Sequence, residues 1–245
     1  MSGRAAATSS YILEDQRLMA GAKKYFDWQC RLVTRQLGQR VLEVGSGIGN
    51  FTGKLLDREA VMAVDVEEDC IERLKSRYAD QANLYAFACD WGAPEWDRQV
   101  LPRIAEFRPD SCVCLNVLEH FADDREALRR MAHVLLPGSV IVVLVPAFPA
   151  LFGPIDELLG HHRRYTRRSV RQAADSARLQ IAAMHYVNAI GFFGWWANAH
   201  LFRRKVQSAT QIGFFDQYIV PLSSRLESVV QPPFGQSLLA VLHKQ

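Results

Sequence analysis

The sequence predicts an α/β protein in which a mostly parallel sheet carries helices on both faces. Three observations lead to this fold class. Short apolar runs alternate with helix-like segments between residues 41 and 145. A glycine-rich turn follows the first run, and acidic or amide side chains follow the next three. Because parallel strands end at the same edge of a sheet, these features are expected to surround one ligand site.

The first predicted strand, 41–44, leads into the glycine-rich turn, where glycine stands at positions 45, 47 and 49. Glycine can adopt positive φ and lets the backbone approach a ligand closely. We expect a helix to begin in 50–56. The third glycine comes one residue earlier than in the G-x-G-x-x-G fingerprint of dinucleotide sites. The carboxylate of Glu43, just before the turn, would repel a pyrophosphate and favours a positively charged ligand.

Residues 41–52 resemble motif I of the class I S-adenosylmethionine-dependent methyltransferases. The resemblance is strong over residues 25–146 and weaker beyond them. It implies a Rossmann-like sheet of seven strands, with the last strand antiparallel, and S-adenosyl-L-methionine as the cofactor. The ammonium and sulfonium groups of that cofactor suit the carboxylate of Glu43.

The second and third predicted strands both end at an aspartate. The second, 61–65, places Asp65 beside the glycine turn, where its carboxylate can accept hydrogen bonds from both ribose hydroxyls. Capping of the following helix is the alternative role for Asp65. The third strand, 84–89, ends at Asp90, to which the resemblance assigns the adenine amino group. Trp91 would stack on the adenine ring, with core packing as the alternative.

Two further residues complete the expected cofactor site. Tyr25 lies on a predicted helix, 16–37, that the family folds over the cofactor; it would bond the methionine carboxylate or pack in the core. Asn116 belongs to the fourth strand, 111–117, and would face the methionine part of the cofactor. The expected cofactor-binding residues are therefore Tyr25, Glu43, Gly45, Ser46, Gly47, Gly49, Asp65, Val66, Asp90, Trp91 and Asn116.

Residues 116–120, Asn-Val-Leu-Glu-His, are similar to the E-x-x-E-H segment of metal-dependent methyltransferases. Asn116 replaces the first acid of that segment and removes one oxygen ligand of a hard cation, so we expect no metal. His120 is the first candidate for a general base, because imidazole has a suitable proton affinity near neutral pH. A hydrogen bond from its ring to the backbone is the alternative. Glu119 is expected to contact the substrate.

The rest of the chain continues the alternation of strands and helices and then departs from it. Asp123 and Asp124 begin an amphipathic helix that Pro137-Gly138 ends. The further predicted elements are helix 67–78, strand 140–145, loop 146–168, helix 169–177, strand 180–187, insertion 188–233 and final strand 237–243.

The loop at 146–168 follows the fifth strand and so lies at the rim of the site. It resembles the H-x-R-R-Y loop of bacterial family members found near glycosyltransferase and polysaccharide functions, which suggests a lid over the substrate. The catalytic candidates in this lid loop are His161, His162 and Tyr165, and the substrate-binding candidates are Asp156 and Arg164. An arginine fork suits a phosphate or a carboxylate. The alternative is that Asp156 pairs with Arg164 to fold the loop.

The insertion is rich in aromatic residues, and its segment 192–205 ends in Arg203-Arg204-Lys205. Aromatic surface followed by basic residues suits a helix that contacts an anionic membrane, or a tunnel for a lipid-linked substrate. Core packing or a homodimer contact is the alternative, and the apolar segment 214–230 is the expected packing partner.

Composition limits the remaining classes. The formal net charge of +3 over 245 residues argues against a protein defined by nucleic-acid binding. The five cysteines show no C-x-x-C spacing and are expected to be reduced. The N-terminus lacks an apolar signal core and no apolar run reaches ~18 residues, so we expect a cytoplasmic protein without a transmembrane helix. We expect a single domain over 1–245, with a helical cap at 1–37.

These observations predict an S-adenosylmethionine-dependent methyltransferase that acts on a small-molecule metabolite by O-methylation, with a histidine general base. C- or N-methylation of a natural product, or of a lipid- or sugar-linked substrate, is an alternative. An inactive cofactor-binding scaffold and a nicotinamide dehydrogenase are the rivals outside this reaction. The fourth strand lacks the Asn/Asp-Pro-Pro-Tyr/Phe motif of adenine-N6 methyltransferases, which disfavours a nucleic-acid substrate.

Overall fold

The chain folds around one seven-stranded sheet with the strand order β3-β2-β1-β4-β5-β7-β6. This computed structural model describes residues 2–203, 206 and 208–245. The strands are β1 (Arg40–Val44), β2 (Ala60–Asp65), β3 (Leu84–Ala88), β4 (Ser111–Leu115), β5 (Val140–Pro146), β6 (Leu179–Val187) and β7 (Ser237–Lys244). Strand β7 lies antiparallel between β5 and β6, and the pairs among β1 to β5 are parallel. The predicted Rossmann-like sheet with an antiparallel last strand is therefore confirmed.

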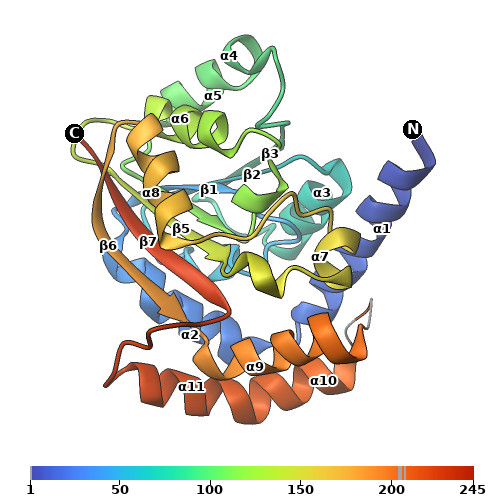
Figure 1. Ribbon diagram of the computed structural model, residues 1–245. Helices are drawn as coiled ribbons and strands as arrows, with labels where there is room; N and C mark the ends of the chain where they lie inside the picture. Colours follow the sequence, from blue (N-terminus) through green and yellow to red (C-terminus); the bar gives the residue numbers. More distant parts are fainter. Residues whose placement is uncertain (1, 204–205, 207) are drawn as a thin grey trace.

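The helices cover the two faces and one end of this sheet (Figure 1). They are α1 (Ser2–Met19), α2 (Lys23–Val33), α3 (Glu68–Arg77), α4 (Trp96–Gln99), α5 (Leu101–Phe107), α6 (Asp124–Val134), α7 (Pro154–Leu158), α8 (Arg167–Ser176), α9 (Ala189–Ala197), α10 (Ala209–Phe214) and α11 (Val220–Glu227). A π-helical turn, Asn198–Phe202, extends α9, and another, Phe215–Ile219, joins α10 to α11. Among the described residues, no helix combines the length and apolar character that crossing a bilayer requires.

Burial alternates along the central strands because successive side chains of a strand point to opposite faces. Cys112 and Cys114 pack in the core beneath α4, α5, α6 and α8, whereas Val113 packs in the core on the α2 side. Both faces are thus covered by helices, so β4 and β5 read in sequence as nearly unbroken apolar runs. The same alternation directs Glu43 of β1 toward the α2 side, between the buried residues Leu42 and Val44.

Two predicted helices differ from the structure. The expected helix at 16–37 is divided into α1 and α2 by a turn at Gly21, consistent with the low helix propensity of glycine. The expected helix at 50–56 is only a 3-10 turn, Thr52–Lys54. Here Gly49 has a φ of +82°, and a Cβ on Gly53 would collide with the hydroxyl of Tyr78. Close approach of α3 therefore favours a tight turn over a regular helix.

The insertion at 188–233 is stabilised by its two acidic residues, one of which bonds to α2 while the other joins the two ends of the insertion. Asp216 lies in the turn between α10 and α11, and its carboxylate accepts hydrogen bonds from the backbone N–H groups of Lys24 (3.3 Å) and Tyr25 (2.8 Å). Glu227 accepts in the same way from Asn188 (3.1 Å) and Ala189 (2.9 Å), at the beginning of α9. Each carboxylate thus pairs with the free N–H groups at a helix N-terminus, where negative charge is favourable.

We expect Asp216→Ala to lower the free energy of unfolding by about 1 to 2 kcal/mol, because the first turn of α2 loses both acceptors. Asp216→Asn retains one acceptor oxygen and is expected to lose less. Urea-induced unfolding followed by circular dichroism measures both values. An alanine variant as stable as the parent would contradict this role for Asp216.

Candidate active site

A cavity of about 550 Å³ lies at the carboxyl ends of β1, β2 and β4. Its walls come from the glycine turn, the strand ends, the lid loop, α1, α2 and the insertion. The predicted site residues that line it are Tyr25, Glu43, Gly45, Ser46, Gly47, Asp65, Val66, Asp90, Trp91, Asn116, Glu119, His120, His161 and Arg164. Gly49, Asp156, His162 and Tyr165 are not among the lining residues.

The glycine turn adopts the conformation that its sequence predicts. Gly45, Gly47 and Gly49 all have positive φ, at +79°, +52° and +82°. A Cβ on Gly45 would collide with the side chain of Val117. Asp65 fixes the turn, because its Oδ2 accepts a hydrogen bond of 2.7 Å from the N–H of Gly47. Its Oδ1 accepts from the N–H of Glu67 at 3.0 Å, so Asp65 also supports the beginning of α3.

Glu43 is buried and paired with a residue that the sequence analysis did not select. The hydroxyl of Thr52 donates a 2.6 Å hydrogen bond to Oε2 of Glu43. Burial raises the pKa of Glu43 to about 8, so the free protein holds this carboxyl largely protonated at neutral pH. A cationic ligand in the cavity would favour the charged form.

Asp90 and Trp91 occupy different environments. Asp90 is exposed at the cavity rim, and its Oδ1 accepts a 2.8 Å hydrogen bond from the N–H of Gly92. Trp91 is buried, packs edge-on against Trp96 and donates from Nε1 to the carbonyl of Ala127 at 3.1 Å. Core packing, the alternative raised for Trp91, is therefore present, although the residue also lines the cavity.

The methionine end of the predicted cofactor site is formed by α2 and the residue after β4. Asn116 has a φ of +54°, a left-handed conformation that asparagine tolerates better than most residues. The side chain of Tyr25 lies against those of Asn116 and Gln29, and burial raises the pKa of Tyr25 to about 12. Both residues are thus held in place before any ligand binds.

Two of the catalytic candidates, His120 and His161, form one cluster with Glu119 and Asp156 between the β4 loop and the lid loop. The ring of His161 approaches Oδ1 of Asp156 through Nδ1 at 2.8 Å and Oε1 of Glu119 through Nε2 at 3.8 Å. The ring centroids of His120 and His161 are 4.7 Å apart, in an edge-to-face arrangement. Asp156 is fully buried and also accepts from Nε of Arg164 at 2.9 Å and from the N–H of Gly153 at 3.0 Å.

Electrostatics distinguishes the members of this cluster. Burial and the neighbouring His161 lower the pKa of His120 to about 3, so this imidazole stays neutral and has little affinity for a proton. Burial raises the pKa of Glu119 to about 7, and neither of its carboxylate oxygens has a hydrogen-bond partner among the described residues. Although burial opposes it, the hydrogen bond from His161 and the charge of Arg164 hold the pKa of Asp156 below its ordinary value.

The structure does not bring His162 or Tyr165 to the cavity, and we correct the sequence-based prediction for both. Tyr165 is fully buried, and its hydroxyl donates to Oδ2 of Asp124 at 2.9 Å and to the carbonyl of Leu118 at 3.2 Å. Burial raises the pKa of its phenol further. His162 is exposed and contributes its backbone N–H, which donates to the carbonyl of Glu119 at 2.9 Å. Both residues therefore attach the lid loop to the segment after β4.

Asp156 and Arg164 adopt the alternative arrangement, an ion pair that folds the lid loop. Nη1 of Arg164 also donates to the carbonyl of Ala147 at 3.2 Å, and its guanidinium lies 4.9 Å from the ring centroid of Trp195. Arg164 still lines the cavity, but its charge is matched by Asp156. This pairing weakens the case for Arg164 as an anion-binding residue.

Comparisons with known proteins agree with this geometry. Residues 42–141 match a family model described as "Methyltransferase domain". A protein of Mycobacterium sp. strain JLS, named as an uncharacterized methyltransferase, is 29% identical over 148 residues, which span 58% of this chain and 55% of that protein. Over residues 42–141 the chain is therefore similar to methyltransferase domains.

Solved structures share the fold of this chain over nearly its whole length. A chain from the complex that contains the Haloferax volcanii Trm112 methyltransferase activator has a TM-score of 0.63, 16% identity and coverage of 97% and 96%. An S-adenosylmethionine-dependent methyltransferase of Clostridium acetobutylicum ATCC 824 has a TM-score of 0.56, 12% identity and coverage of 91% of both chains. The chain spans little more than half the length of the curated mycobacterial relatives that it matches.

The cavity fits the polar cofactor S-adenosyl-L-methionine. Four residues that line it carry buried polar atoms without a partner among the described residues: Asp15, Gln29, Ser46 and Glu119. Buried polar atoms are rarely left unpaired, so this group indicates a ligand with its own donors and acceptors. Asp65 accepts hydrogen bonds from the backbone of Gly47 and Glu67, and its carboxylate has further lone pairs for ribose hydroxyls.

Asp15, Gln16 and Gln29 also line the cavity and are among the residues that the sequence analysis missed. Gln16 of α1 lies over the glycine turn, where its Oε1 accepts from the N–H of Ile48 at 3.0 Å and its carbonyl accepts from Asn50 at 2.8 Å. Burial raises the pKa of Asp15 to about 6, against the opposing effect of His161. No motif marks these positions; the only available signal is polar residues on otherwise apolar helix faces.

Glu43→Gln tests the buried acid beside the glycine turn. In the folded protein Glu43 keeps its proton up to pH about 8, whereas the reference value for the unfolded chain is 4.5. The protonated carboxyl of Glu43 therefore contributes its full stabilisation below pH 4.5, the pKa in the unfolded chain. This stabilisation is lost as the pH rises through about 8, the pKa in the folded protein. We expect the glutamine variant to lose less stability than the parent between about pH 5 and pH 8.

Urea-induced unfolding of the free protein at each pH measures this difference. Glu68→Gln is the matched control, because Glu68 is an exposed acid of α3 that does not line the cavity. It is expected to retain the pH dependence of the parent. An equal pH dependence in Glu43→Gln and the parent would contradict burial of a protonated Glu43.

Proposed function

We propose that the protein transfers a methyl group from S-adenosyl-L-methionine to a hydroxyl oxygen of a small amphipathic metabolite. The observation that carries the proposal is the Asp156–His161 pair on the acceptor side of the cavity, at an Oδ1–Nδ1 distance of 2.8 Å. The residues that would hold the cofactor are Tyr25, the glycine turn, Asp65, Asp90 and Asn116. When bound, the cofactor supplies a methyl group activated by a positively charged sulfur.

His161 is the residue that we assign as the general base. With Nδ1 donating to the Asp156 carboxylate, Nε2 keeps its lone pair and is available to take the proton of an acceptor hydroxyl. The developing imidazolium would be stabilised by Asp156 and by Glu119, whose Oε1 lies 3.8 Å from Nε2. His120, the first candidate from the sequence, has a pKa of about 3 and is a weak base at neutral pH. We assign His120 the role of a neutral neighbour that positions His161.

The cavity walls support an acceptor with an apolar part. Phe26, Trp195, Ile212 and Phe215 line the side formed by α2 and the insertion, whereas Glu119 and the two histidines line the other side. An acceptor that places an apolar group against the insertion presents its polar end to His161. Because Arg164 is already paired with Asp156, a strongly anionic acceptor has less support than a neutral hydroxyl.

Incubation with S-adenosylmethionine labelled in the methyl group identifies the acceptor class. Separate lipid, water-soluble small-molecule, RNA and protein fractions of a cell extract are offered to the enzyme, and the label in each fraction is counted. We expect the label in a small-molecule or lipid fraction, as an alkali-stable methyl ether. Label confined to RNA or protein would contradict the proposal, and no label in any fraction would favour an inactive scaffold.

We expect His161→Asn to lower turnover of the labelled acceptor by about 100-fold or more, because the proton acceptor is lost. Its affinity for S-adenosylhomocysteine, measured by calorimetry, should not change. His120→Asn is the matched control and is expected to lose much less activity. The reverse order of activities would show that the base is His120.

Asp65→Ala is expected to weaken S-adenosylhomocysteine binding by about tenfold to 100-fold, because a charged acceptor for the ribose hydroxyls is removed. Asp69→Asn removes an exposed acid of α3 outside the cavity and is expected to bind as tightly as the parent. Calorimetry measures both constants. Equal affinities in the parent and Asp65→Ala would contradict the placement of the ribose beside Asp65.

One observation favours a second mechanism, in which a divalent cation activates the acceptor. One ligand atom each of Glu119, His120 and His161 lie within 4.8 Å of one another, and the carboxylate of Glu119 lacks a protein partner among the described residues. A cation there would lower the pKa of a bound hydroxyl directly, and Nε2 of His161 would be a ligand instead of a base. The missing acid at Asn116 supports the metal-free mechanism.

Chelation separates the two mechanisms. We expect turnover to survive dialysis against EDTA and to remain unchanged on addition of Mg²⁺, Mn²⁺ or Zn²⁺. Loss of turnover on chelation, with recovery on addition of one of these ions, would replace the histidine base by the cation mechanism.

A further inference from the structure

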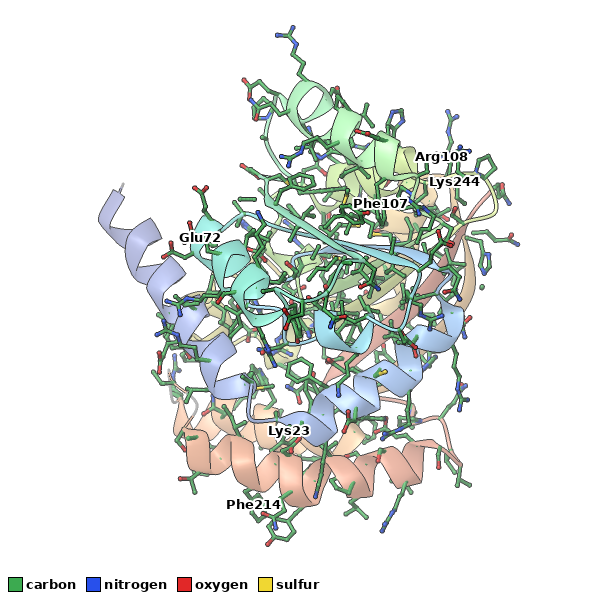
Figure 2. The ribbon with its side chains drawn as sticks, turned by 180° about the vertical axis from the view of Figure 1, so that it is seen from behind. Lys23, Glu72, Phe107, Arg108, Phe214 and Lys244 are labelled. Atoms are coloured by element: carbon green, nitrogen blue, oxygen red, sulfur yellow. The ribbon has the colours of Figure 1, made fainter. Side chains whose placement is uncertain are left out.

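The helix formed by α10, the Phe215–Ile219 turn and α11 carries an exposed apolar row along its outer side. Phe214, Tyr218, Leu222 and Leu226 follow one another at intervals of four residues and are 58%, 57%, 57% and 53% exposed. Figure 2 shows Phe214 pointing away from the body of the protein. The other side of this helix is buried, as Ile212, Val220 and Ser223 show. The sequence analysis expected 214–230 to pack against the aromatic segment and did not anticipate this exposed row.

A second apolar group lies on α9 and the turn that follows it. Phe193, Trp196 and Leu201 are 60%, 45% and 65% exposed. Both groups belong to helices gathered at one end of the molecule, at the bottom of Figure 1. We call the exposed residues at this end the cap surface: Phe193, Trp196, Leu201, Phe214, Tyr218, Leu222, Leu226, Val229 and Val230. An exposed apolar surface of this extent is unusual unless something covers it.

The charges around the cap surface are positive. Residues 188–235 contain only two acids, Asp216 and Glu227, and both carboxylates accept hydrogen bonds from helix N-termini. The exposed charged side chains left in the described part of this segment are Arg203 and Arg225. Lys23 adds a further exposed cation at the same end of the molecule (Figure 2). Arg204 and Lys205, part of the predicted basic segment, lie outside the described residues.

We propose that the cap surface binds the surface of an anionic phospholipid bilayer. Aromatic and aliphatic side chains would enter the interface between headgroups and acyl chains, and the surrounding basic side chains would pair with anionic headgroups. Charge complementarity selects lipid over a second copy of the chain. If two copies met through their cap surfaces, Arg203 and Arg225 of one copy would lie against the same residues of the other. Such contacts between like charges are unfavourable.

This placement connects the bilayer to the cavity. Trp195 lines the cavity, and its neighbour Trp196 is exposed on the cap surface. Ile212 lines the cavity as well, and Phe214 is exposed two residues later in the same helix. The wall that contacts the acceptor is therefore the inner side of the helices that would contact lipid. The lipid contact itself requires no methyl transfer and stands whether or not the proposed reaction is correct.

Sedimentation of the full chain with vesicles tests the proposal. Vesicles of phosphatidylcholine alone are compared with vesicles that also contain phosphatidylglycerol. We expect binding to the anionic vesicles and little binding to the neutral ones. Phe214→Ser with Leu222→Ser is expected to weaken binding by at least about tenfold, because two exposed apolar side chains no longer enter the interface. Arg203→Gln with Arg225→Gln is expected to weaken it by about tenfold and to reduce its salt dependence.

Leu136→Ser is the matched control, because Leu136 is 47% exposed just beyond the end of α6, away from the cap surface. It should bind vesicles as the parent does, and circular dichroism confirms that each variant is folded. Absence of binding to anionic vesicles overturns the proposal, as does equal binding by the parent and the Phe214→Ser, Leu222→Ser variant. A parent dimer in analytical ultracentrifugation that this variant dissociates would assign the surface to a second copy instead.

Discussion

The buried carboxylate of Asp156 is the interaction on which the acceptor side of the cavity depends. A fully buried charge is unfavourable unless donors surround it, and three donors from the lid loop meet this requirement: Nδ1 of His161, Nε of Arg164 and the N–H of Gly153. Satisfying one charge therefore folds the loop, orients an imidazole and places Arg164 against Trp195. The conformation of the lid loop and the orientation of the His161 ring therefore depend on the same buried carboxylate.

The cofactor side and the acceptor side of the cavity arise from different kinds of interaction. The cofactor side is local: a strand end, a glycine turn and one aspartate two elements later determine its shape. The acceptor side is assembled from β4, the lid loop, α1 and the insertion, which are far apart in the chain. This difference explains why the cofactor can be inferred from a short motif, whereas the acceptor is inferred only from the packed walls.

The same difference sets the limits of what the sequence could predict. The strands were predictable because burial on both faces leaves nearly continuous apolar runs, and the positive φ of Gly45 follows from its place after β1. Tyr165 was predicted to be catalytic because acidic and basic residues lie close to it in the sequence. In the structure its hydroxyl donates a hydrogen bond to Asp124, which is 41 positions away in the chain. Gln16 and Gln29 were missed because single amides on helices have no motif. Their importance comes from the segments that α1 and α2 approach.

Gln16 also sets a free-energy cost for opening the cavity on the side of α1. Its two hydrogen bonds to the glycine turn contribute about 2 kcal/mol net, which limits the population of a detached α1 to at most a few per cent.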